Sequence, residues 1–338
     1  MQTIDLLTKI KQAVMANPAV VSQIAVSDIE SMVYLETQCR RQLYPKEQLQ
    51  ETEAFFGSIL NKLGEAFNKR DIFSVPGELD RLISYLRILP DTEYVSDFIE
   101  EANRDHVRLS HVLNHTIWVV GDSHVNFFSG NEELSFIPIG NDINTCRQVG
   151  ELPFSVFHLG PCLAFNANKY GTTSRFREKL EYLLANVIEE KAKIMFTMGE
   201  IDIRAHVFKE TEKQGCSFEA IVDGILENYV DMMKSVRDKG YTVSCFGPIA
   251  SQSDGVPADE EVFTRFGTEE DRNRATGYFT HRLEEMLKIE SIPFLSVFEQ
   301  MVSEDGYTKY QYLCPDLCHL GQAALPLVKE ELRQKGIL

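Results

Sequence analysis

The sequence predicts an α/β protein, in which a doubly wound parallel sheet follows an all-helical N-terminal region. Two observations carry this prediction. Up to residue 112 the apolar residues recur at helical spacing, and no segment has the short apolar pattern of a strand. After Asn114, short apolar segments alternate with amphipathic ones, as in a sheet covered by helices on both faces. We therefore expect a helical region over residues 1–113 and an α/β domain over residues 114–338.

The N-terminal helices are delimited by local signals. Ser27 and Glu30 have the spacing of a capping box, which predicts the start of a helix that stops before Pro45. Further helices are expected at the N-terminus and at about residues 46–70, 77–89 and 94–113. Three roles stay open for these helices: a cap on the sheet, a lid over a site, or a homo-oligomer contact. One buried stripe is predicted from Phe55, Phe56, Ile59, Leu60, Leu63 and Phe67.

The expected α/β domain contains six strand candidates and four long helices. Ser217 is a suitable N-cap for one of these helices, and Gly240 is a suitable stop for it. The strands are expected at residues 116–120, 134–139, 154–159, 193–198, 241–246 and 292–298, and the helices at about residues 173–191, 217–239, 268–289 and 321–335.

Composition excludes several classes of function. The 51 acidic residues outnumber the 34 basic ones and give a net charge of −17, which disfavours binding to a phosphate backbone. The seven scattered cysteines indicate reduced thiols, and Cys314 and Cys318 lack a second pair at zinc spacing, so no metal is expected. The N-terminal segment lacks the order of a signal peptide, and no apolar run is long enough to span a membrane. A cytoplasmic protein is expected.

Polar residues follow the predicted strands where each one ends. Because the carboxyl ends of parallel strands meet at one edge of a sheet, ligands bind there. A serine hydroxyl needs a neighbouring imidazole to accept its proton, and the imidazole needs a carboxylate to fix its tautomer. Asp316 and His319, three residues apart, can supply both groups to Ser123. The polar residues at this edge are Asp122, Ser123 and His124 after the first strand, Gly160 after the third, and Glu200, Asp202 and Arg204 after the fourth.

Four short motifs, in order along the chain, resemble those of the SGNH hydrolase superfamily, also called GDSL-type esterases. They are Gly121-Asp122-Ser123, Gly160, the GEID segment from Gly199 to Asp202, and Asp316-x-x-His319. The resemblance covers roughly residues 115 to 337. It implies that Ser123 is the nucleophile, His319 the general base and Asp316 its partner, and that the backbone N–H groups of Ser123 and Gly160 form the oxyanion hole. It also implies cleavage of ester bonds, often in acylated carbohydrates or lipids, without a metal or an organic cofactor.

One position departs from the family pattern. The family has Gly-x-Asn-Asp, and its asparagine side chain donates to the oxyanion, but this chain has Ile201 at that place. Losing one such donor costs about 100- to 1000-fold in rate. Arg204 is the favoured replacement. Neutral alternatives are Asn126, Asn144 and Asn166.

Several of these residues also have a non-catalytic interpretation. Gly160, Arg204, Asp122, His124, Asp202 and Glu200 are candidates for oxyanion or substrate binding. His124 contacts substrate or merely fills the turn. Glu200, Asp202 and His206 suggest a metal, but a salt bridge to Arg204 is favoured because one short segment gives an incomplete ligand shell. His158, Cys162 and Cys245 are expected in the core.

Three hypotheses for function follow. The first is a serine esterase that hydrolyses an O-acyl, most simply acetyl, ester on a small-molecule or glycan substrate. The second is an acyltransferase that uses the same three residues and passes the acyl group to a sugar hydroxyl. The third is a non-catalytic binding protein in which Ile201 marks a decayed oxyanion hole.

Overall fold

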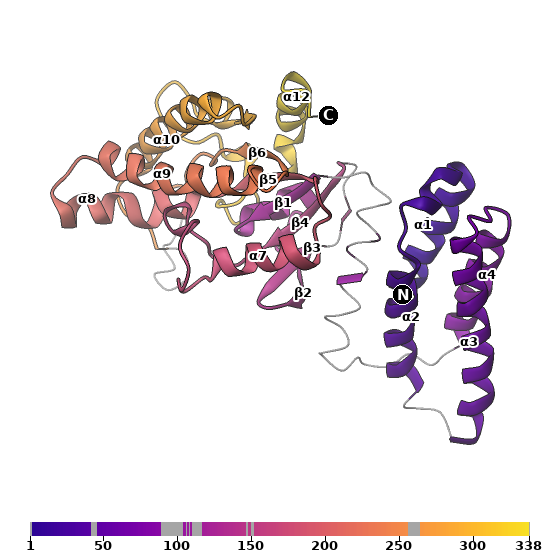
Figure 1. Cartoon of the computed structure of the whole chain (residues 1–338). Helices are drawn as coiled ribbons and strands as arrows, with labels where there is room; N and C mark the ends of the chain where they lie inside the picture. Colours follow the sequence, from indigo (N-terminus) through magenta and orange to yellow (C-terminus); the bar gives the residue numbers. More distant parts are fainter. Residues whose placement is uncertain are drawn as a thin grey trace. The chain divides into compact units, whose positions relative to one another are not determined.

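The computed structural model describes residues 2–41, 46–88, 104–105, 107, 109, 117–146, 148–149, 152–255 and 264–337 (Figure 1). The chain divides into two compact units, one of residues 1–116 with 137–140 and one of residues 117–136 with 141–338. The helix expected at residues 94–113 lies almost wholly outside the described residues. Of its span, residues 104, 105, 107 and 109 are described, and they are helical.

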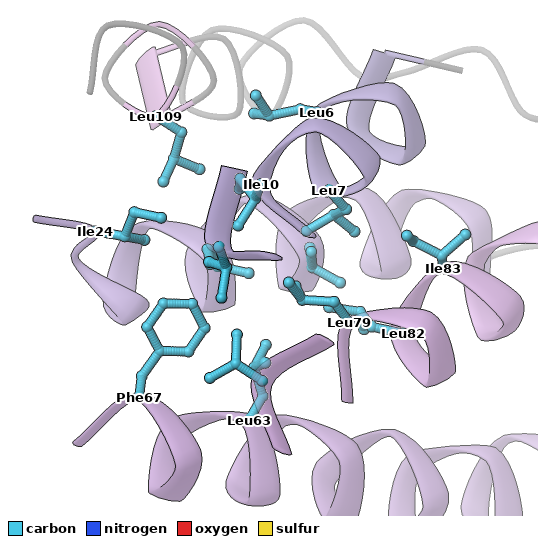
Figure 2. Close-up of a cluster of buried hydrophobic side chains, with 14 of the residues drawn as sticks. Leu6, Leu7, Ile10, Ile24, Leu63, Phe67, Leu79, Leu82, Ile83 and Leu109 are labelled. Atoms are coloured by element: carbon cyan, nitrogen blue, oxygen red, sulfur yellow. The ribbon is translucent and has the colours of Figure 1, made fainter. Parts of the chain in front are cut away.

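The first unit has a core of buried aliphatic and aromatic side chains from several helices (Figure 2). Phe67 and Leu63 contribute to it, whereas Phe55 is 50% exposed, contrary to the predicted stripe. At 100° per residue Phe55 lies about 80° from the centre of the stripe, at its edge. The described elements of this unit are α1 (Gln2–Ala16), η1 (Pro18–Ser22), α2 (Val26–Arg41), α3 (Lys46–Asn68) and α4 (Ser74–Ile88).

The start of α2 corrects the capping-box prediction. The helix begins at Val26, so Ser27 lies inside the first turn rather than before it. The Asp28 N–H already donates to the Ala25 carbonyl at 3.1 Å. A capping box forms instead at α10, where Thr268 and Asp271 each accept the other's backbone N–H.

A seven-stranded sheet, in the order β2-β3-β4-β1-β5-β6-β7, forms the α/β fold. The run β4-β1-β5-β6-β7 is parallel, and β3 is antiparallel to β4. The sheet is therefore mixed rather than purely parallel. The strands are β1 (Ile117–Gly121), β2 (Phe136–Gly140), β3 (Ile143–Cys146), β4 (Phe154–His158), β5 (Lys193–Thr197), β6 (Thr242–Phe246) and β7 (Phe294–Leu295).

Strand β3 was missed by the sequence analysis. It follows β2 after Asn141 and Asp142, which both have positive φ, at 54° and 56°. Two consecutive left-handed residues make the type I′ turn of a tight hairpin, and Asn and Asp tolerate that conformation. The short segment Ile143–Cys146 is too polar to stand out as a strand in a sequence.

The central strand β1 is buried along its whole length, because helices cover both faces of the sheet (Figure 1). On one face Val119 joins a cluster with Val328 and Leu332 of α12. On the other, the Trp118 ring stacks on Phe157 at 4.8 Å, and Cys245 Sγ of β6 lies 3.6 Å from the Tyr229 hydroxyl of α9. Successive side chains of β1 point to opposite faces of the sheet. Because both faces are buried, the strand is one continuous hydrophobic run in the sequence.

The remaining helices lie between the strands or, from α11 onwards, after β7. Helix α7 is shorter than expected and begins after Arg175, whose φ is 51°. No helix among the described residues is long and apolar enough to cross a membrane. The elements are η2 (Ser123–Val125), α6 (Asn126–Ser129), η3 (Ala164–Asn166), α7 (Phe176–Asn186), η4 (Asp202–Val207), α8 (Phe208–Gln214), α9 (Phe218–Arg237), α10 (Glu269–Ile289), α11 (Phe298–Met301), η5 (Tyr310–Tyr312), η6 (Gln322–Ala324) and α12 (Leu325–Gln334).

Candidate active site

Ser123 stands at the tip of the central strand. Strand β1 ends at Gly121, where a Cβ would lie 1.9 Å from the Thr197 carbonyl oxygen of β5, so only glycine fits. Asp122 then caps the short helix η2 by accepting the His124 N–H at 3.0 Å. Asp122 is wholly buried, so its carboxylate holds the turn and does not lie at the surface of the site. The sharp turn presents Ser123 at the carboxyl edge of the sheet.

A separate loop before α12 brings His319 and Asp316 to this edge. The loop is closed by a bridge between Leu313 and Leu320, and the Cys314 N–H donates to the His319 carbonyl at 2.7 Å. Gly321 packs so closely on Leu313 that a Cβ would lie 2.9 Å from its backbone. Tight closure fixes the backbone on both sides of the histidine.

Two side chains tie the histidine loop to the segment that follows Ser123. The Gln322 amide donates to the Phe127 carbonyl at 2.8 Å. Glu132 accepts the Gln322 backbone N–H at 2.7 Å. These contacts join segments that are almost two hundred residues apart, and the sequence carried no signal for them.

Ser123, His319 and Asp316 form one line of hydrogen bonds. The Ser123 Oγ lies 2.6 Å from His319 Nε2, and His319 Nδ1 lies 2.6 Å from Asp316 Oδ2. Asp316 Oδ1 also accepts the backbone N–H groups of Cys318 and His319, at 2.9 and 3.0 Å. Burial opposes ionisation of Asp316, but these hydrogen bonds outweigh it and hold its pKa well below the usual range. A carboxylate is therefore kept beside the imidazole.

Backbone donors lie next to Ser123. In the parallel pair of β1 and β4, Gly121 is paired with His158, so Ser123 and Gly160 stand at matching positions two residues further on. Among the described residues, neither the Ser123 N–H nor the Gly160 N–H has a hydrogen-bond acceptor. Gly160 has a φ of 94°, a conformation that favours glycine. Two unpaired N–H groups beside a hydroxyl can bind an anionic oxygen.

Asp202 anchors the loop that begins at Gly160. Its carboxylate accepts the N–H of Ala164 at 2.8 Å and that of Phe165 at 3.1 Å. Asp202 is wholly buried, and burial raises its pKa to about 7 although these hydrogen bonds act in the other direction. It lies in η4, a π-helical turn, a feature that is frequent at functional sites. Its role in the structure is to hold this loop.

His124, Glu200 and Arg204 form a buried polar chain beside the histidine. Arg204 Nε donates to Glu200 Oε1 at 2.7 Å, and Glu200 Oε2 lies 3.4 Å from His124 Nε2. Burial opposes the charge on Glu200, but Arg204 and His124 outweigh it and lower its pKa to about 2. The His124 ring packs against the His319 ring at a centroid distance of 4.8 Å. The salt bridge preferred in the sequence analysis is present, formed by Glu200 rather than Asp202.

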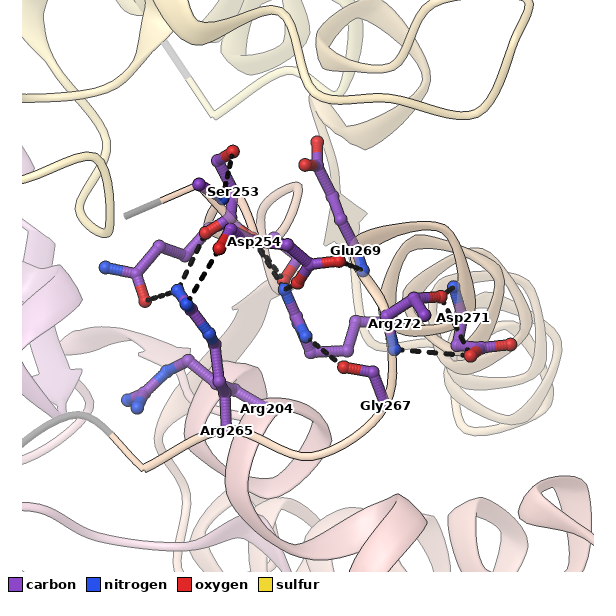
Figure 3. A network of polar contacts seen from close by, with 12 residues as sticks. Arg204, Ser253, Asp254, Arg265, Gly267, Glu269, Asp271 and Arg272 are labelled. Atoms are coloured by element: carbon purple, nitrogen blue, oxygen red, sulfur yellow. Dashed lines mark hydrogen bonds and ion pairs between the residues drawn. The ribbon is translucent and has the colours of Figure 1, made fainter. Parts of the chain in front are cut away.

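The guanidinium of Arg204 is also held from the other side. Its Nη1 donates to the Thr264 carbonyl at 3.0 Å. The neighbouring segment, residues 264–272, is fixed by Arg272, which is 0% exposed and binds the loop after β6 (Figure 3). Arg272 donates to Ser251 Oγ at 2.7 Å and to Asp254 Oδ1 at 2.8 Å. Arg204 is thus part of a rigid buried array.

The three asparagines predicted as neutral alternatives to Arg204 lie in different places. Both hydrogen bonds of the Asn126 amide nitrogen go to backbone carbonyls, those of Asn131 and Glu133, each at 3.1 Å. Asn144 is paired with His158 in the sheet. Asn166 ends η3, in the loop that Asp202 holds.

The residues expected in the core differ in their environment. Cys162 and Cys245 are buried, as predicted. His158 is only half-buried, because it is the last residue of β4 and lies at the carboxyl edge of the sheet. Its ring stacks on Phe136 at 4.0 Å. Burial, with the nearby charges of Lys179 and His319, lowers the His158 pKa to about 4. Over the described part of the chain, no three or more His, Cys, Asp or Glu side chains are grouped so as to hold a metal ion.

Comparisons with known proteins add a fold-level likeness. No protein-family model matches the sequence, and no curated protein matches it. A GDSL-like lipase from Bacteroides thetaiotaomicron is similar, with 13% identity, 67% of this chain and 90% of that chain covered, and a TM-score of 0.40. The esterase EstA of Pseudoalteromonas is similar with 11% identity, 66% of this chain and 96% of that chain covered, and a TM-score of 0.34. The C-terminal domain of Drosophila Oskar is similar with 9% identity, 65% of this chain and 87% of that chain covered, and a TM-score of 0.38. At these TM-scores we draw no inference from the names, and the function proposed below rests on the geometry of the site.

Proposed function

We propose that this chain is a serine esterase that hydrolyses an O-acyl ester through an acyl-enzyme. Ser123 acts as the nucleophile, His319 as the general base and Asp316 as the partner that orients the imidazole. The observation that carries the proposal is the unbroken line of two 2.6 Å contacts joining these side chains across 196 residues of sequence. That arrangement is the one in which a serine hydroxyl becomes nucleophilic at neutral pH.

The first half of the reaction acylates the serine. The Ser123 Oγ attacks the ester carbonyl carbon while its proton passes to His319 Nε2. The carbonyl oxygen becomes an oxyanion, which accepts hydrogen bonds from the N–H groups of Ser123 and Gly160. Asp316 stays ionised and stabilises the imidazolium. When the tetrahedral intermediate collapses, the C–O bond to the alcohol breaks, and the alcohol takes the proton from His319.

The second half releases the acid. Water gives a proton to His319 Nε2 and attacks the acyl carbon, and the same N–H groups hold the new oxyanion. Collapse breaks the bond to Ser123 Oγ, which recovers its proton from His319. The net change is the addition of one water across one ester bond, and no cofactor takes part.

The proposal also specifies a class of substrate. We assign a short acyl group, most simply acetyl, on a carbohydrate-containing alcohol, which the sequence resemblance to SGNH hydrolases supports. A reducing, cytoplasmic setting belongs to the same proposal and is supported by the six cysteines whose side chains the structure describes, which are all free thiols. Arg204 donates to Glu200 and Thr264, so we assign it to supporting His124 and not to direct binding of the oxyanion.

Hydrolysis of p-nitrophenyl acetate by purified Ser123→Ala tests the proposal. The variant should lose all activity above the uncatalysed rate, while Ser58→Ala, at an exposed position of α3, should match the wild type. A fluorophosphonate should add one covalent group to the wild type at Ser123 and none to the variant, as read by mass spectrometry. Equal rates for wild type and Ser123→Ala would refute the proposal. Acyl transfer to an added glycan that outpaces hydrolysis would replace the esterase by an acyltransferase with the same residues.

A further inference from the structure

The peptide group between Leu159 and Gly160 has a charged partner. Its carbonyl oxygen accepts a hydrogen bond of 2.8 Å from Lys179 Nζ. Lys179 comes from α7 and is only 8% exposed. The N–H of the same peptide group is that of Gly160, which has no acceptor among the described residues and stands at the position matching Ser123. A cation therefore binds one end of a peptide group whose other end is unpaired beside the serine.

We propose that Lys179 is a positioning residue of the reaction. Its ammonium polarises the Leu159–Gly160 peptide group and so strengthens the Gly160 N–H as a donor to the oxyanion. This inference rests on the proposed esterase function and deepens it, because it names a residue through which the oxyanion hole gains strength.

The physical basis is the resonance of the amide. In a trans peptide the C=O and N–H bonds point in opposite directions, so Lys179 and an oxyanion bind opposite ends of one group without competing. A positive donor on the oxygen draws electron density from the nitrogen and makes the N–H more acidic. Hydrogen bonds arranged in this way strengthen one another, and bonds to charged groups are about twice as strong as neutral ones.

The Lys179 amine lies against Gly160, and two opposing effects act on its charge. Burial lowers the pKa of Lys179, and the nearby carboxylate of Asp142 acts in the opposite direction. A Cβ on Gly160 would lie 3.5 Å from Lys179 Nζ, in ordinary contact, so the lysine lies directly against this residue. The loop beyond it is fixed by Asp202, which holds Ala164 and Phe165. The loop is thus held at two places, by Lys179 at the Leu159–Gly160 peptide group and by Asp202 at Ala164 and Phe165.

This arrangement also accounts for Ile201. The family pattern has an asparagine amide at that place as a third oxyanion donor, and Ile201 has no polar atom to offer. A strengthened Gly160 N–H compensates in part for the missing donor. One peptide group then does more of the work of stabilising the negative charge than it would in a site with three donors.

Kinetics of Lys179→Met give the first test. We expect kcat for p-nitrophenyl acetate to fall about tenfold with KM within about twofold, because a whole oxyanion donor is worth about 100- to 1000-fold and only part of one is lost. The matched control is Lys169→Met, which removes an equal charge from an exposed lysine whose Nζ lies over the Phe165 ring at 3.8 Å. It should leave kcat unchanged. Lys179→Arg, which keeps a cationic donor, should recover most of the loss.

A spectroscopic test reads the peptide group directly. The chain has three Leu-Gly pairs, at Gly64, Gly160 and Gly321. Labelling with carbonyl-13C leucine and 15N glycine therefore gives three carbonyl-to-amide correlations. In Lys179→Met the Leu159 carbonyl carbon and the Gly160 amide proton should both move upfield, while the Gly64 signal stays in place. If Lys179 only filled space, Lys179→Met would leave these two chemical shifts unchanged and would not lower kcat selectively over KM.

The outcomes separate this inference from the proposed function. A folded Lys179→Met with wild-type kcat, or with an unmoved Gly160 signal, overturns the inference and leaves the esterase intact. A wild type without hydrolysis and without a phosphonate adduct overturns both, whatever the spectrum shows. If Lys179→Met does not fold, Lys179→Gln carries the test: the inference requires a lower kcat and a moved Gly160 signal, and their absence overturns it.

Discussion

Replacing Asp316 by asparagine tests how the histidine is oriented. Asp316 Oδ1 is held by two backbone N–H groups, and Oδ2 by the ring of His319. In Asp316→Asn the amide oxygen must keep the Oδ1 place, because the NH2 group would otherwise be set against two donors. The NH2 group then points at His319 Nδ1 and donates to it. The ring is forced to carry its proton on Nε2, where it cannot accept one from Ser123.

The expected loss is large because the base is held in the wrong tautomer. An asparagine in the same place of a serine triad lowers kcat by about 10⁴, which corresponds to about 5.5 kcal/mol of transition-state stabilisation. KM for p-nitrophenyl acetate should change little, because Asp316 sits behind the imidazole.

Steady-state hydrolysis of p-nitrophenyl acetate at pH 7.5 measures the effect. The control is Asp231→Asn, which alters an exposed carboxylate of α9 that pairs with Lys234, and it should keep the wild-type rate. Thermal unfolding of both variants shows that each is folded. An Asp316→Asn enzyme within tenfold of the wild type would refute the tautomer argument, since Asp316 Oδ2 is the group that bonds His319 Nδ1 at 2.6 Å.

Three further predictions concern stability. Arg204→Met leaves the buried carboxylate of Glu200 without its cation and should lower the free energy of unfolding in urea by about 3–5 kcal/mol; a loss below about 1 kcal/mol would contradict a buried ion pair. Gly121→Ala sets a Cβ 1.9 Å from a carbonyl oxygen of β5 and should give no folded protein by circular dichroism, whereas Gly224→Ala, with no atom within 4 Å of its Cβ in α9, should be stabilised by about 0.5–1 kcal/mol. His158 has a pKa of about 4 in the folded chain and about 6.5 in the unfolded chain, so between these values the unfolded chain binds more protons and stability rises with pH. Relative to His158→Phe, the wild type should therefore gain about 2–3 kcal/mol from pH 4 to pH 7 in urea unfolding, and parallel curves for the two proteins would contradict the shifted pKa.

The fold could be predicted because its signals are local. Continuous apolar strands such as Ile117–Gly121, and amphipathic helices such as Phe218–Arg237, each carry their own pattern in a short window. Strand Ile143–Cys146 has no such pattern, because it gains its place from pairing with β4. The cap of α2 was misplaced by two residues: Ser27 has the right spacing for a cap, but the helix begins at Val26 and the Asp28 N–H already donates to the Ala25 carbonyl.

The site could be predicted only in part. Ser123, Asp316 and His319 are reactive residue types at recognisable places, and the structure brings them into one line. Lys179 carries no signal, because a lysine in an amphipathic helix is expected to be a solvated side chain. It is revealed by a three-dimensional contact with the Leu159 carbonyl. A residue that acts through the backbone of another residue produces no characteristic motif or residue spacing in the sequence.

The long separation between Ser123 and His319 also bears on how the protein is made. The ribosome makes the chain from its N-terminus, so Ser123 and its strand emerge 196 residues before His319, the proposed general base. On the proposed mechanism, the serine stays unreactive until His319 has been made. On the proposed mechanism, activity therefore requires the loop closed by Leu313 and Leu320, which is among the last segments to be made. A product truncated before that loop would lack the proposed general base and also helix α12, whose Val328 and Leu332 cover one face of the sheet.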